Sequence, residues 1–169
     1  MGYLCIQVVG LLFIVASEAA TTIHLFPAGI VSEATIKGNL INAYNRFLRG
    51  KKISFYLNGE KLIDQSTVTT DQINALNLSQ SPPLSCSHWY MNQLEDDADN
   101  YILTDHNPCN GTQTVQEARQ FLARNRFKKG SSIVPIGMGN QINSQWLKQT
   151  CGPCTPPLGC VRGWNWFRL

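Results

Sequence analysis

Alternating apolar and polar positions predict short strands in the first half of the chain. The segments 34–41 and 52–58 both alternate in this way, as a half-buried strand does. Asn58-Gly59 closes the second segment and is typical of a tight β-hairpin. Further short candidates lie between positions 62 and 78, and Ser81-Pro82-Pro83 then interrupts the pattern. Short strands with turn residues between them predict a small antiparallel sandwich or barrel.

The half of the chain after Cys109 has the spacing of a helix instead. Thr114 and Glu117 have the types and spacing of a capping box, in which each side chain meets the other residue's backbone N–H. One apolar face follows, made of Val115, Ala118, Phe121 and Leu122. We therefore predict a basic amphipathic helix over about 115–129, whose cationic face is either solvated or directed at an anionic surface. The expected fold class is α+β: a small antiparallel β-sandwich-like N-terminal half, one basic amphipathic helix and a Cys/Pro-rich tail.

The first residues have the pattern of a secretory signal peptide. Residues 8–16 form an apolar run that is too short to cross a bilayer, and Ser17 and Ala19 offer small residues at a cleavage site. A buried N-terminal strand is the alternative interpretation of the same run. We expect three regions: 1–19 as the signal peptide, 20–108 as a β-rich region, and 109–169 as the helix with a Cys-rich C-terminal region. We find no second long apolar run, so we expect no transmembrane segment.

The charge of the chain is mildly basic. The formal net charge is +3, and removal of Glu18 with the signal peptide makes it +4. Lys and Arg form no dense stripe with interleaved aromatic residues, so the sequence does not predict a nucleic-acid partner.

Cysteines and glycosylation sequons fit a secretory route. Five cysteines follow the signal peptide and are candidates for disulfides: Cys86, Cys109, Cys151, Cys154 and Cys160. The odd number leaves one thiol over, and the sequence leaves the pairing open. Asn77-Leu78-Ser79 and Asn110-Gly111-Thr112 are sequons, so Asn77 and Asn110 are candidate glycosylation sites.

The motifs that carry chemistry do not assemble into a catalytic set. Cys151-Gly152-Pro153-Cys154 has the form of a redox motif, but Pro156 and Pro157 prevent the long helix that such a motif needs, which favours a structural disulfide. Three isolated histidines predict neither a metal ion nor another cofactor: His24, His88 and His106. The acidic run 95–99 is expected to be a solvated loop, with weak calcium binding as the alternative. We find no phosphate loop or nucleophile elbow and predict that the protein is not an enzyme.

A short basic motif resembles a known family. Arg46, Phe47, Leu48 and Arg49 begin 27 residues after Ala19. A secreted chain with Arg-x-Leu-Arg in this window resembles the RxLR effectors of oomycete plant pathogens. The resemblance implies a secreted virulence effector that enters the host cell, in the cytoplasm or nucleus. It would suppress plant immunity and cell death by binding a host protein, with residues 46–49 as the translocation motif.

A second resemblance covers more residues. Positions 38–59, with Phe55, Leu57 and Asn58-Gly59 at their end, look like the bacterial and archaeal Ig-like repeats of adhesins. This resemblance implies a secreted, disulfide-bonded Ig-like module for extracellular adhesion or binding. Under it, residues 46–49 form the loop that enters the next strand, and Leu48 is a packing residue.

Overall fold

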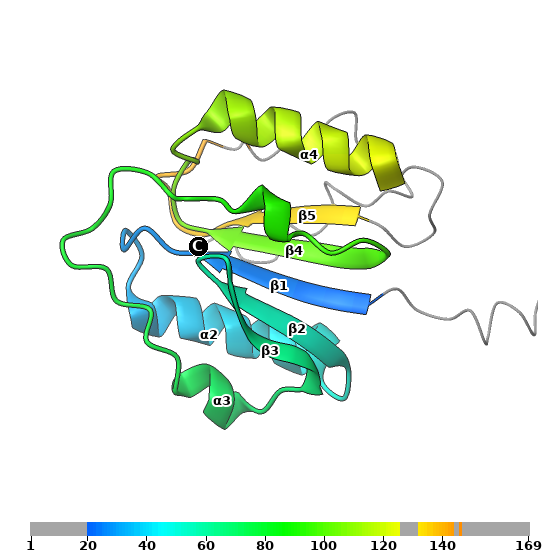
Figure 1. The fold of residues 1–169 in the computed structure, drawn as a ribbon. Helices are drawn as coiled ribbons and strands as arrows, with labels where there is room; N and C mark the ends of the chain where they lie inside the picture. Colours follow the sequence, from blue (N-terminus) through cyan, green and yellow to red (C-terminus); the bar gives the residue numbers. More distant parts are fainter. Residues whose placement is uncertain (1–19, 126–131, 144–145, 147–169) are drawn as a thin grey trace, which may run out of the picture.

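The computed structural model describes residues 20–125, 132–143 and 146, and these form one sheet with helices on both faces (Figure 1). The strands are β1 (Ala20–Phe26), β2 (Lys52–Leu57), β3 (Glu60–Thr67), β4 (Ala98–Thr104) and β5 (Ser132–Gly137). The helices are α2 (Glu33–Ala43), α3 (Thr70–Asn74) and α4 (Gly111–Asn125), with a π-helical turn η1 (Tyr44–Leu48) and a 3₁₀ turn η2 (Met91–Gln93).

The sheet is mostly parallel, which corrects the predicted antiparallel sandwich. Its order is β3-β2-β1-β4-β5, and only the hairpin partner β3 runs antiparallel to its neighbour. Helices α2 and α4 each connect two parallel strands across one face of the sheet, a connection that antiparallel hairpins do not need. The α+β class is confirmed, because helices and strands both contribute to the core, whereas the two-sheet arrangement is wrong.

Helix α2 replaces the strand that we predicted over 34–41. Its buried residues Ile36, Asn39, Leu40 and Ala43 have the spacing of one helical face. The Ser32 side chain caps the helix by accepting a hydrogen bond from the Thr35 backbone N–H at 3.2 Å. Ile36 and Leu40 are four positions apart, which fits both a strand period and a helix period, and burial against the sheet selects the helix.

Helix α4 confirms the predicted helix but begins a turn earlier. The Thr114 backbone N–H donates to the Asn110 carbonyl, so Thr114 lies inside the helix and is not its cap. The capping box of the structure is Thr69 with Gln72, at the start of α3. Lys128 and Lys129, at the predicted end of the helix, lie outside the described residues.

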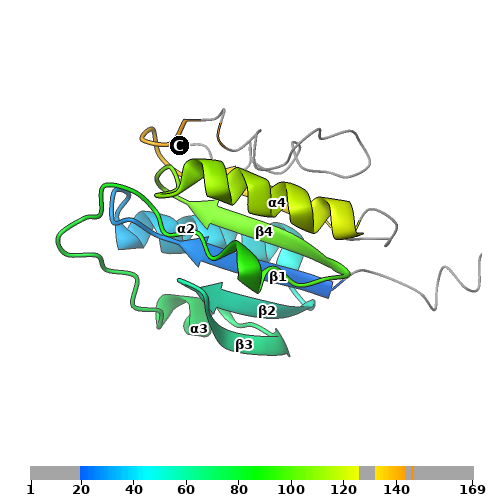
Figure 2. The same ribbon diagram turned by 45° about the horizontal axis from the view of Figure 1, so that its top comes forward.

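Two apolar clusters fill the space between the sheet and its helices. One lies on the face covered by α2 and α3 and includes Ile23, Leu25 and Phe55. The other lies on the face covered by α4 and includes Phe26, Ile102 and Phe121. Figure 2 shows α4 and α2 on opposite sides of the sheet. Adjacent strands therefore receive support from both faces, as buried parallel strands require.

The predicted boundary between two regions at position 108 falls within the residues of a single sheet. Strand β4 lies before this boundary and pairs with β5, which lies after it. The predicted signal peptide, residues 1–19, lies outside the described residues, as do Cys151, Cys154 and Cys160. Among the described residues, no helix has the length and apolar character needed to span a membrane.

Candidate functional site

The strand order places a candidate site between β1 and β4. After β1 the chain passes to β2 on one side, and after β4 it passes to β5 on the other side. Open α/β sheets bind ligands outside the carboxyl ends of their strands, at the point where the connections diverge in this way. Here that point is formed by the loop 27–32 after β1 and the loop 105–110 after β4, which we call the carboxyl edge.

A buried carboxylate fixes the loop after β1. Asp105 has no exposed surface, and its Oδ1 accepts a hydrogen bond from the Ala28 backbone N–H at 2.6 Å. Its Oδ2 accepts from the backbone N–H groups of Ile30 at 2.8 Å and Val31 at 2.9 Å. We call this set of three bonds the Asp105 clamp. Charge-assisted bonds of this kind are the strong ones, so the clamp holds the loop in one shape.

A disulfide and a buried hydroxyl pair fix the loop after β4. Cys86 is bonded to Cys109, which places one pairing among those that the sequence left open. The intervening Ser87 is buried, and its backbone exchanges hydrogen bonds with Asn107 and Cys109 at 2.8 Å each. The Ser87 Oγ lies 2.9 Å from the Thr104 hydroxyl at the end of β4. The loop is therefore anchored covalently and through the end of the strand.

The exposed surface of the carboxyl edge is neutral and partly apolar. Asp105 is the one Asp, Glu, Lys or Arg in the loops 27–32 and 105–110, and it is buried. Ile30 is 38% exposed, and Tyr90 is 41% exposed. The Tyr90 ring lies against Gly59, where a Cβ atom would come within 2.6 Å of it, and its centroid is 6.0 Å from that of Phe26 at the end of β1. The edge thus presents apolar groups beside neutral polar ones.

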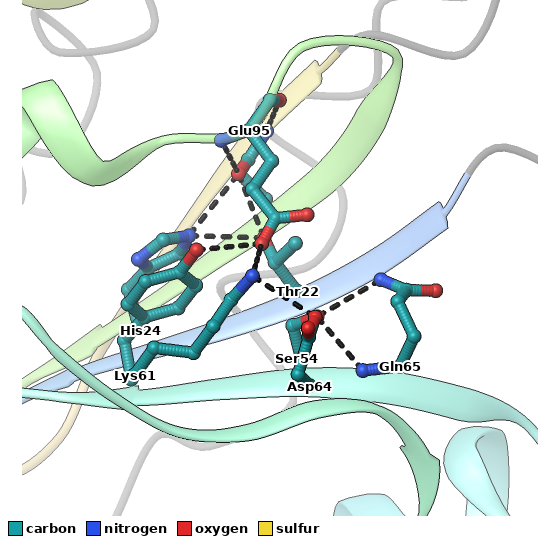
Figure 3. A network of polar contacts seen from close by, with 9 residues as sticks. Thr22, His24, Ser54, Lys61, Asp64, Gln65 and Glu95 are labelled. Carbon is teal, nitrogen blue, oxygen red and sulfur yellow. Dashed lines mark hydrogen bonds and ion pairs between the residues drawn. The ribbon is translucent and has the colours of Figure 1, made fainter.

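A second candidate is a polar network on the sheet face, drawn in Figure 3. It consists of Thr22, His24, Ser54, Tyr56, Lys61, Asp64, Gln65, Glu95 and Asn100. At its centre His24 is fully buried, stacks on the Tyr56 ring at 4.6 Å and has its Nε2 3.1 Å from Asn100 Oδ1. The Tyr56 hydroxyl donates to Glu95 at 2.6 Å, and Glu95 pairs with Lys61 at 3.1 Å.

Burial keeps the histidine of this network neutral. Burial lowers the pKa of His24 from 6.5 to about 4, against a smaller opposing effect of the Asn100 hydrogen bond and of the Glu95 charge. Burial also raises the pKa of Tyr56, together with its hydrogen bond to Glu95. Since His24 has no exposed surface, it contributes to the packing of β1, β2 and β4 and does not reach a molecule in solution.

The sequence-predicted site residues are divided: Cys109 and Asn110 belong to the loop 105–110 of the carboxyl edge, whereas the residues of the predicted translocation motif lie away from it. Arg46 and Arg49 are exposed, whereas Leu48 is buried at 8% exposure. These three residues lie between the end of α2 and the start of β2, at the edge of the sheet opposite the carboxyl edge. The candidate glycosylation sites Asn77 and Asn110 are both exposed.

The acidic run 95–99 is more structured than a solvated loop. Glu95 belongs to the polar network, and Asp96 pairs with Arg124 at 3.3 Å. Asp99 accepts a hydrogen bond from the Ser132 hydroxyl at 2.8 Å. Asp105 was not predicted from the sequence, where the available signal is a carboxylate two positions after the apolar pair Ile102-Leu103.

Comparison with known proteins gives a fold and no family. No protein-family model matches the chain, and no curated protein matches it. Among solved structures, it is similar to proximal thread matrix protein 1 from the mussel byssus, with a TM-score of 0.53 and 15% sequence identity. The match covers 80% of this chain and 40% of that chain, so this chain spans less than half the length of that protein. At this identity the likeness shows the fold alone.

That structure is described as having a zinc-occupied MIDAS motif, and the residues described here do not fit such an ion. Among the described residues, no group of three or more His, Cys, Asp or Glu side chains gathers that could hold a metal. At the carboxyl edge both oxygens of Asp105 are already used by backbone N–H donors. Ala28 and Ile30 in the same loop carry no side-chain oxygen.

Proposed function

We propose that the chain is a secreted, non-catalytic binding module that holds a macromolecular partner at its carboxyl edge. The single observation that carries the proposal is the position of two anchored loops at the point between β1 and β4 where the connections diverge. General experience with open α/β sheets supports a binding role for this point.

Preorganisation supports binding through these loops. The Asp105 clamp fixes the loop after β1, and the Cys86–Cys109 disulfide fixes the loop after β4. Loops that are already in one shape lose little conformational freedom when a partner binds, which favours affinity. The disulfide also fits the secretory route that the leader segment predicts.

The neutral, partly apolar surface favours a protein partner over a charged one. Ile30 is exposed in the loop 27–32, and Tyr90 is exposed beside Phe26 at the end of β1, so both offer apolar contact area. The loops 27–32 and 105–110 offer no exposed carboxylate or ammonium group, and the exposed Glu60 follows Gly59 under the Tyr90 ring. The similar structure is that of a matrix protein, and this is our reason to choose extracellular matrix proteins as the first probes.

Binding to purified fibrillar collagen and fibronectin tests the proposal, with the chain lacking residues 1–19 measured by biolayer interferometry. Ile30→Gln should weaken binding by about three- to sevenfold, since Ile30 is 38% exposed and burial of that part of an Ile side chain contributes about 0.6–1.1 kcal/mol. Leu62→Gln is the matched control, because Leu62 is 43% exposed on the edge strand β3. Absence of binding to both probes, or an equal loss in both variants, would contradict the proposal.

The effector prediction is a second candidate and stays a prediction. Exposure of Arg46 and Arg49 on a turn is the observation that favours it. Replacing both by Ala should abolish uptake into plant cells and restore cell death in leaves that co-express an elicitor. Unchanged uptake in that variant, together with fully bridged thiols in the secreted protein, would contradict the effector prediction. The extracellular binding module would then be the favoured function.

A further inference from the structure

A stretch of the chain opposite the carboxyl edge carries positive charge without any acidic residue. From Ala34 to Gly59 there is no Asp or Glu. Four cations lie close together within it, and we call them the basic turn: Arg46, Arg49, Lys51 and Lys52. They lie on η1, on the turn that follows it and at the start of β2.

All four side chains of the basic turn are exposed. The ion pairs found among the described residues involve Lys37, Lys61 and Arg124, and none of them includes a cation of the basic turn. Like charges that lie close together without a carboxylate repel one another. A polyanion would relieve that repulsion and release its own counterions on binding.

The backbone under the basic turn is fixed. Leu48 is buried in the core, and its carbonyl accepts a hydrogen bond from the Lys51 backbone N–H at 3.0 Å. The Arg49 guanidinium donates to Asn45 Oδ1 at 2.7 Å and lies 5.8 Å above the Tyr44 ring. Gly50 has a φ of +78°, which an L side chain rarely adopts, and turns the chain into β2. The cations are therefore held on a shaped turn, and π-helical turns of this kind are frequent at functional sites.

We propose that the basic turn binds a sulfated polysaccharide. Sulfate groups spaced along a polysaccharide match several separate cations and need no deep pocket. Stable attachment to a membrane would need an apolar anchor beside the charge, and a measurement of vesicle binding separates a membrane surface from the polysaccharide. This surface is separate from the carboxyl edge and does not depend on the function proposed there.

Binding to heparin tests the inference with two matched charge reversals. Arg46→Glu changes the basic turn, and Arg119→Glu makes the same change of charge on an exposed residue of α4. We expect the chain without residues 1–19 to bind heparin at 150 mM NaCl, about the physiological ionic strength. Arg46→Glu should weaken binding about tenfold or more, and Arg119→Glu less than about threefold. Equal melting temperatures would show that both variants are folded.

Three results would overturn the inference. The chain would fail to bind heparin at that salt concentration, or both reversals would weaken binding equally, which would indicate an effect of net charge alone. Alternatively, vesicles of phosphatidylserine and phosphatidylcholine or a single-stranded DNA would bind as tightly as heparin at the same ionic strength. Unsulfated hyaluronan should bind much more weakly than heparin, and equal binding would also contradict the role of sulfate.

Discussion

Replacing Asp105 by Asn tests the physical basis of the carboxyl edge. The side chain keeps its size but loses its charge, and one of its two oxygens becomes a donor. In the orientation that loses least, the amide oxygen keeps the bonds from Ile30 and Val31, and the NH₂ group faces the Ala28 N–H that the carboxylate now accepts at 2.6 Å. One bond to a charged acceptor is then lost, which costs about 1.5–3 kcal/mol, and the other two become weaker neutral bonds.

We therefore expect Asp105→Asn to lower the free energy of unfolding by about 3–5 kcal/mol. The melting temperature should fall on the order of 10 °C for a chain of this size. Urea unfolding followed by tryptophan fluorescence measures this change. Asp71→Asn is the control, because Asp71 is exposed in the first turn of α3 and should cost at most about 1 kcal/mol. A loss below about 1 kcal/mol in Asp105→Asn would refute the clamp as described.

Three further outcomes are expected. The pKa of His24 is about 4 in the folded chain and 6.5 ordinarily, so the unfolded chain binds the proton at a higher pH than the folded chain does. The free energy of unfolding should therefore fall by about 3 kcal/mol as the pH drops from about 6.5 to 4. A His24→Asn variant that keeps this pH dependence in urea titrations would contradict the assignment. EDTA should leave the melting temperature within about 1 °C, because the carboxylate oxygens at the carboxyl edge already have donors; a larger fall would indicate a bound metal. Leu48→Ala should lower the free energy of unfolding by about 2–5 kcal/mol, because Leu48 is buried. Arg46→Ala should lower it by less than about 0.5 kcal/mol, because Arg46 is exposed. Equal losses of stability in thermal melts would refute the packing role of Leu48.

The β2–β3 hairpin was predictable because its signal is local. Asn58 and Gly59 have φ values of +49° and +81°, which the dipeptide Asn-Gly tolerates well. The alternation over 52–58 also corresponds to β2. Strand β1 gave no such signal, because it is buried on both faces and its polar residues Thr22 and His24 form hydrogen bonds with Asn100, 76 or more positions away.

Helix α2 and the Asp105 clamp show what a local pattern cannot supply. The segment 34–41 contains Thr35, Ile36 and Gly38, which disfavour a helix, and burial of Ile36 and Leu40 against the sheet overrides that preference. Asp105 meets its three donors across 74–77 positions of the chain. Its role therefore depends on the pairing of β1 with β4, which a one-dimensional pattern does not contain.

The position of β1 in the sheet has a consequence for biosynthesis. Strand β1 is made before the other strands of the sheet, yet one of its two edges pairs with β4, whose last residue is Thr104. At ordinary translation rates of about 5–20 residues per second, that edge waits about 4–16 seconds for its partner. Throughout that interval the nascent chain exposes the unpaired N–H and C=O groups of an apolar strand, which is the form of a chain that chaperones bind. The strand in the middle of the sheet is therefore one whose pairing is completed late in synthesis.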